Sequence, residues 1–103
     1  MLKDVMSLVL YALGSKKKDQ SGLQRMSGEE IREASHLGPS DIKEALKILE
    51  ADGFVKVAWS HGFDTYDFAE VWLLPKGRLE YEQRREEFYR VMKDWESSKK
   101  GLV

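Results

Sequence analysis

The sequence predicts an α+β domain that is mostly helical, on the basis of three patterns. Over residues 1–14 the apolar positions recur every three or four residues, which is typical of an amphipathic helix. Ser27 and Glu30 have the spacing of a capping box, which marks the start of another helix. Over residues 54–59 the apolar positions alternate instead, which indicates a strand. A chain of 103 residues has the size of a single domain, so we expect residues 1–103 to share one core.

The first predicted helix spans residues 1–14 and ends at Gly14, and its apolar positions form one face. Those positions are Leu2, Val5, Met6, Val9, Leu10 and Leu13. Residues 15–25 follow and contain a lysine triplet among Ser, Gly and Gln residues. This composition predicts a polar, mobile connector.

Two helices joined by a tight turn are predicted over residues 27–53. The first is expected to bury Ile31 and Ala34 and to end near Ser35. The second begins at Pro39, because proline suits the first helical position, where its missing N–H costs nothing. The buried face of this second helix is predicted to consist of Ile42, Ala45, Leu46 and Leu49.

A β-hairpin over residues 54–74 and a highly charged helix over residues 76–98 complete the predicted fold. In the first strand of the hairpin, Val55, Val57 and Trp59 are expected to lie on one side of the sheet and to face the core.

The final helix carries an apolar stripe formed by Phe88, Met92 and Trp95. Because a helix of this length exceeds what a small domain needs to cover its core, the stripe requires a further cover. We expect a homodimer in which this stripe pairs with its copy, joined by Leu2 and Met6 of the first helix. The alternative is that the stripe folds back on the first helix of the same chain.

This order of elements resembles the winged helix-turn-helix fold, which has a three-helix core, a two-stranded β wing and a long C-terminal helix. Three segments are similar to segments of MarR- and PadR-like transcription regulators. They are residues 27–46, LEADGFV at Leu49–Val55 and LLPKGRLEYE at Leu73–Glu82. Leu74 stands where that family commonly has Thr. The resemblance implies a homodimeric, sequence-specific regulator of transcription that places its third helix in the major groove of double-stranded DNA.

The resemblance also implies which residues contact DNA. On the third helix the residues that read bases would be Ser40, Asp41, Lys43, Glu44 and Lys47. The wing tip would add His61 and Thr65. Basic residues outside the third helix would hold the phosphates, namely Lys16, Lys17, Lys18, Arg25, Lys76 and Arg78.

The charge distribution favours a different function. Residues 27–52 contain three basic and seven acidic side chains, a net charge of −4, whereas a DNA-binding surface derives most of its non-specific affinity from positive charge. The alternative is a winged-helix module for protein–protein interaction that uses this acidic face and its aromatic wing without binding DNA. Phe63 and Tyr66, at the wing tip, would then contact the protein partner.

Catalysis and metal binding have little support in the sequence. There is no Cys, and the two His residues, His36 and His61, are too few for a recognisable metal site. No glycine-rich phosphate loop and no serine nucleophile motif is present, so we expect neither a cofactor nor an enzyme. The longest apolar stretch, residues 1–13, is far below the roughly 20 residues of a membrane span, so we expect a cytoplasmic protein without a membrane partner.

Overall fold

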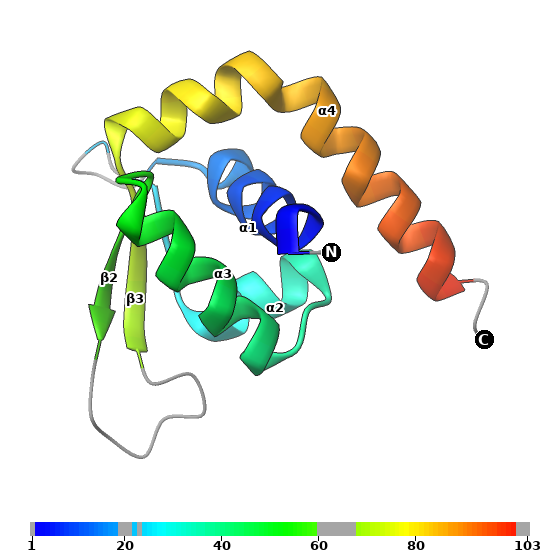
Figure 1. The fold of residues 1–103 in the computed structure, drawn as a ribbon, viewed down its shortest axis with the longest axis horizontal. Coiled ribbons are helices and arrows are strands. Elements are labelled where there is room, and N and C mark those ends of the chain that lie inside the picture. The colour runs from blue at the N-terminus through cyan, green and yellow to red at the C-terminus, as the bar shows by residue number, and fades with distance from the viewer. Residues whose placement is uncertain (1, 19–21, 23, 60–67, 101–103) are drawn as a thin grey trace.

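The computed structural model describes residues 2–18, 22, 24–59 and 68–100, which form an α+β fold that is mostly helical (Figure 1). In chain order its elements are α1 (Leu2–Ser15), β1 (Arg25–Met26), α2 (Gly28–Ser35), α3 (Pro39–Ala51), β2 (Val55–Trp59), β3 (Phe68–Leu73) and α4 (Pro75–Lys100). The predicted α+β class is confirmed, as is the predicted order of helices and hairpin. The bounds of the predicted elements differ from the observed ones by one or two residues.

α1 is the central helix of the fold. α4 covers one side of it, while α2 and α3 pack against the other (Figure 1). Ser7, Leu8 and Ala12 are therefore buried in addition to Val9 and Leu13 of the predicted apolar face. The sequence predicts one buried face for this helix, and the structure buries it on nearly all sides because two layers of helices enclose it.

α2 begins at the predicted capping box. The N–H of Glu30 donates to Oγ of Ser27 at 3.2 Å, and the N–H of Ser27 donates to Oε1 of Glu30 at 3.1 Å. Ile31 is buried as predicted, but the predicted burial of Ala34 is wrong, because that side chain is exposed. Ser35 takes the buried place instead, one full turn after Ile31 on the same helix face.

Within the described ranges the sheet has three antiparallel strands in the order β1-β3-β2, so that β3 lies between the other two. Arg25 and Met26 of β1 pair with Trp72 and Val71 of β3. The prediction of an irregular connector up to residue 25 is therefore wrong at its end. A strand of two residues is too short for any alternation of apolar side chains to reveal it.

The predicted inward position of Trp59 is also wrong. Val55 and Val57 are buried, but the register between β2 and β3 shifts between Val57 and Trp59. Such an irregularity changes the face on which the following side chain lies, and 37% of Trp59 is exposed. Its indole packs edge-on against the ring of Phe68, at 5.9 Å between ring centroids.

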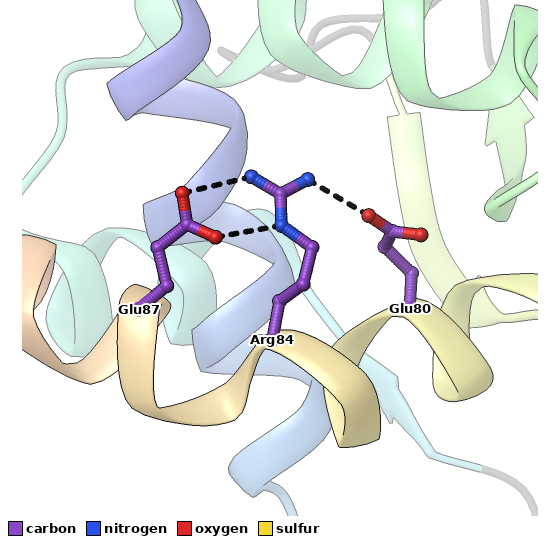
Figure 2. A network of polar contacts seen from close by, with 3 residues as sticks. All are labelled: Glu80, Arg84 and Glu87. Carbon is purple, nitrogen blue, oxygen red and sulfur yellow. Dashed lines mark hydrogen bonds and ion pairs between the residues drawn. The ribbon is translucent and has the colours of Figure 1, made fainter.

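α4 bends over α1, and Arg84 marks the bend with non-helical dihedral angles of φ −119° and ψ 20° (Figure 1). Figure 2 shows its guanidinium group between two carboxylates of the same helix. Nη1 lies 2.8 Å from Glu80, while Nε and Nη2 lie 2.8 Å and 3.1 Å from the two oxygens of Glu87. The hydrogen bonds to Glu87 and then Glu80 raise the pKa of Arg84 above its already high value, so this side chain stays charged.

The expectation that Phe88, Met92 and Trp95 form a surplus stripe is wrong. Phe88 and Met92 are only 1% and 5% exposed within a single chain, because α4 packs along α1. Trp95 is half-buried and hydrogen-bonded to α2. The stripe folds back on the first helix of its own chain, which was the alternative interpretation. Of the other residues assigned to the dimer, Met6 packs against this same core and the side chain of Leu2 lies outside the described part.

The first turn of α4 approaches the main chain that precedes β2. Gly77 is buried, and a Cβ atom at this position would overlap the main-chain oxygen of Phe54 and lie 2.8 Å from Cδ1 of Leu73. The Phe54 oxygen also accepts a hydrogen bond of 3.0 Å from the N–H of Leu74. The absence of a side chain at Gly77 therefore allows this close approach.

Candidate nucleic-acid interface

α3 presents an apolar face to the core and a polar face to solvent. Its buried residues are, as predicted, Ile42, Ala45, Leu46 and Leu49. Of the five residues expected to read bases, Lys43 is half-buried and the exposed ones are Ser40, Asp41, Glu44 and Lys47. Since helix positions three and four residues apart share a side, Ser40, Glu44 and Lys47 lie in one line opposite the core. We call these three residues the α3 stripe.

The turn between α2 and α3 is held by several hydrogen bonds. Oγ of Ser35 donates to the main-chain oxygen of Ile31 at 2.6 Å and accepts from the N–H of Leu37 at 3.3 Å. His36 adopts the left-handed conformation, with φ 59° and ψ 26°, and its N–H donates to the oxygen of Arg32 at 2.7 Å. These bonds fix the direction in which α3 leaves α2, and with it the direction of the α3 stripe.

Four of the basic residues predicted to hold phosphates have acceptors within the chain. The pairs are Lys16 with Glu30, Arg25 with Glu70 (3.4 Å), Arg78 with Glu82 (3.2 Å), and Lys76 with the main-chain oxygen of Asp52 (2.7 Å). Arg25 lies in β1 rather than in a connector. Any DNA phosphate would have to compete with these acceptors, and the role of the four residues in DNA binding stays a prediction.

The α3 stripe itself carries one positive charge, that of Lys47. Lys47 of α3 and Lys56 of the neighbouring strand β2 are exposed, and neither forms an ion pair with the residues that the structure describes. Lys17 and Lys18 are likewise exposed, in the segment that follows α1. Asp41 and Glu44 add two carboxylates to the solvent face of the same helix.

Lys16 contributes to the start of α2. Its hydrogen bond to the Glu30 carboxylate holds the pKa of that carboxyl below its ordinary value of 4.5, and the main-chain N–H of Ser27 lowers it further. The same carboxylate thus accepts from the lysine and completes the capping box. In this arrangement Lys16 stabilises a helix terminus.

The predicted wing tip cannot be placed against α3, because its residues lie outside the described ranges. These residues are His61, Phe63, Thr65 and Tyr66. The described ends of the hairpin are Trp59 and Phe68, whose rings are in contact.

Sequence reasoning missed the role of Glu50, in the last turn of α3. Its two carboxylate oxygens lie 2.9 Å from the main-chain nitrogen of Val57 and 2.8 Å from Nε1 of Trp59. A glutamate near a helix end is ordinarily solvated, so its position in the sequence carried no signal of these contacts.

Within the described ranges, no three His, Cys, Asp or Glu side chains gather where they would hold a metal ion. Among the described helices none is long and apolar enough to cross a membrane.

Comparisons of the chain with protein-family models, with curated proteins and with solved structures found no match.

Proposed function

We propose that this protein is a winged helix-turn-helix regulator of transcription that binds double-stranded DNA as a homodimer, with α3 in the major groove. The observation that carries the proposal is the α3 stripe, a line of exposed polar side chains on a helix whose opposite face is fully buried. The major groove is about 12 Å wide and admits one α-helix. The order α2, turn, α3 and hairpin is also that of DNA-binding proteins of this class.

The chemistry of the α3 stripe suits G·C base pairs. The carboxylate of Glu44 can accept from N4 of cytosine, and the ammonium group of Lys47 can donate to O6 or N7 of guanine. These two side chains are three residues apart, so they would reach neighbouring positions of the groove. Ser40, near the N-terminus of α3, has a hydroxyl that suits a base or a phosphate.

The charges of the described residues predict a shallow salt dependence of DNA binding. Lys47 in the α3 stripe and Lys56 in β2, the strand that packs against α3, are exposed and form no ion pair with the described residues. Two such cations in each of two protomers give a slope of about −4 in log K against log salt concentration. A protein that relied on all six predicted phosphate contacts in addition would show a much steeper slope.

The experiment is selection of double-stranded DNA from a random pool at two salt concentrations. A matched pair of double variants then tests the groove helix: Lys43→Ala with Lys47→Ala on α3, and Arg85→Ala with Arg90→Ala on α4. Both remove two positive charges, but α1 lies between α3 and α4 (Figure 1). We expect the α3 variant to lose at least about tenfold in affinity for the selected DNA and the α4 variant to retain it. Unchanged affinity in the α3 variant would contradict the proposed groove helix.

A homodimer needs an interface other than Phe88 and Met92, which a single chain already buries. Among the described residues of α4, the large apolar side chains that remain exposed are Leu79 at 55% and Tyr89 at 46%. We therefore place the interface at these two exposed side chains of α4, of which Tyr89 also contacts the ring of Tyr11 in α1, at 6.1 Å between ring centroids. Leu79→Glu combined with Tyr89→Glu is expected to give folded monomers in light scattering, and a persistent dimer would place the interface elsewhere.

A second candidate function is the protein-interaction module, and the internal pairing of Lys16, Arg25 and Arg78 favours it. An Asp52→Asn variant, just after α3 and outside the residues predicted to read bases, separates the two functions. Removal of this exposed carboxylate should strengthen binding to DNA, whose phosphates repel it, whereas a basic protein partner would lose an attractive charge. Absence of DNA binding in wild type and variant, even at low salt, would favour the interaction module.

A further inference from the structure

Glu50 connects α3 to the hairpin through a single carboxylate. Oε2 accepts a hydrogen bond of 2.9 Å from the main-chain N–H of Val57, and Oε1 accepts one of 2.8 Å from the indole N–H of Trp59. Both donors belong to β2, and they lie on either side of the register shift in that strand. One side chain of α3 therefore holds both parts of the irregular strand.

The first of these bonds satisfies an edge of the sheet. β2 is an outer strand in the order β1-β3-β2, and an outer strand leaves alternate N–H groups unpaired. The Val57 N–H is used by Glu50, so this part of the edge is closed by α3. The second bond orients the indole of Trp59, whose ring contacts Phe68 at the start of β3 at an interplanar angle of 81°.

We infer that Glu50 is a positioning residue that fixes the β2–β3 hairpin relative to the α3 stripe, so that helix and hairpin meet a DNA partner as one rigid body. The consequence for DNA binding rests on the proposed function. Glu50 is three residues from Lys47, at the end of the helix that the α3 stripe occupies. Among the described residues, a hairpin released from Glu50 would remain joined to α3 by the connection at residues 52–54, where the N–H of Phe54 donates to the oxygen of Leu49 at 2.9 Å, and by packing.

The carboxylate is the group that these two donors require. Both partners present an N–H, and a carboxylate is an acceptor at both oxygens. A glutamine has one oxygen and one NH₂ group, and the NH₂ group would face an N–H without forming a bond. Glu50→Gln therefore loses one of the two bonds while it keeps the shape of the side chain.

Trp59→Phe provides an independent variant of the same contact. It removes the indole N–H, retains an aromatic ring beside Phe68 and changes no charge. Glu50→Gln removes a negative charge, which by itself would strengthen binding to a polyanion. A loss of DNA affinity shared by the two variants therefore reports the position of the hairpin and not the electrostatic potential.

The test measures three properties of each variant: hydrogen exchange of the Val57 amide, affinity for the DNA selected by the wild type, and the hydroxyl-radical footprint on that DNA. Glu86→Gln serves as the control, because Glu86 is exposed on α4 and contacts none of the described side chains by a hydrogen bond or ion pair. In Glu50→Gln and Trp59→Phe we expect exchange at Val57 to be about tenfold faster and DNA affinity to fall several-fold. The footprint should lose the flanking part, which the hairpin protects, and should keep the central part, which α3 protects. The double variant should lose little more than either single one.

Each outcome decides a separate claim. Unchanged exchange at Val57 in both variants would overturn the role of Glu50 in fixing the hairpin. Faster exchange with wild-type affinity and footprint would overturn the inference for DNA binding and leave the proposed function intact. If the wild type bound no DNA even at low salt, the proposed function would fail, and the exchange rates would still decide whether Glu50 fixes the hairpin.

Discussion

The indole nitrogen of Trp95 donates a hydrogen bond of 2.8 Å to the main-chain oxygen of Ser35, which joins the C-terminal half of α4 to the end of α2. The hydroxyl of the same Ser35 bonds within α2 and to Leu37, at the turn that leads into α3. The last helix thus supports the turn before the proposed groove helix.

Substitution of Trp95 should affect stability within the monomer. We expect Trp95→Phe to lower the free energy of unfolding by about 1 kcal/mol, because the Ser35 oxygen loses its donor, and Trp95→Ala to lower it by about 3 kcal/mol through lost packing. Urea unfolding of both variants measures this, with Arg90→Ala at an exposed position of α4 as the control. Dissociation of an oligomer without any loss of stability would instead place Trp95 between two copies of the chain.

The capping box of α2 should make stability depend on pH. The pKa of Glu30 in the folded chain lies below its ordinary value of 4.5, because Lys16 and the Ser27 N–H stabilise the carboxylate. The contribution of Glu30 is therefore complete above pH 4.5 and is lost as the pH falls through the lowered value. We expect Glu30→Gln to be less stable than the wild type at neutral pH and to approach wild-type stability well below pH 4.5.

Unfolding in urea at both pH values checks this expectation. Glu33→Gln is the matched control, because it makes the same change of charge on an exposed face of the same helix. A difference between wild type and Glu30→Gln that persists in acid would show that the ionised carboxylate is not responsible.

The network around Arg84 should require a guanidinium group. Lysine cannot bond to Glu80 and to both oxygens of Glu87 at once, and it would lose the contact of the guanidinium with the ring of Phe88, at 5.0 Å. We expect Arg84→Lys to cost about 1 kcal/mol at low salt and less in about 1 M NaCl, because these side chains are partly exposed and salt screens them. Arg85→Lys, at the exposed next position, should have no effect, and an equal cost in both variants would exclude a specific network.

A methyl group at Gly77 should be poorly tolerated. It would overlap the main-chain oxygen of Phe54, which cannot move without loss of its hydrogen bond from Leu74. We expect Gly77→Ala to destabilise the protein by about 2 kcal/mol, although alanine favours a helix. Gly38→Ala meets no atom within 4 Å and should cost less than half as much in thermal or urea unfolding. Equal stability of the two variants would contradict the close approach.

The features that the sequence predicted correctly are those encoded by neighbouring residues. Ser27 and Glu30 form their capping box, and Pro39 begins α3, because each effect depends on groups within one turn of helix. The buried face of α3 was likewise predictable, since a single apolar stripe on a helix has one core to face.

The features that the sequence did not reveal depend on residues far apart in the chain. Three features can be known only once it is known which segments meet. These are the burial of Phe88 against α1, the pairing of β1 with β3, and the acceptors of the basic side chains. The exposed position of Trp59 depends on a register shift against β3, which alternation within β2 cannot show. For the proposed interface, the side chains of α3 were predictable from its helical period, whereas Glu50 was recognised only from its contacts with Val57 and Trp59.

The central place of α1 also governs the order in which the chain can fold. One of the two layers that enclose α1 is α4, and contacts between segments so distant in the chain form slowly because a large loop must close first. During translation α1 leaves the ribosome long before α4 does, with the side that α4 will cover still open to water. A nascent chain halted before α4 therefore remains prone to aggregation or chaperone binding, and the native state is completed only when the last helix has been synthesised.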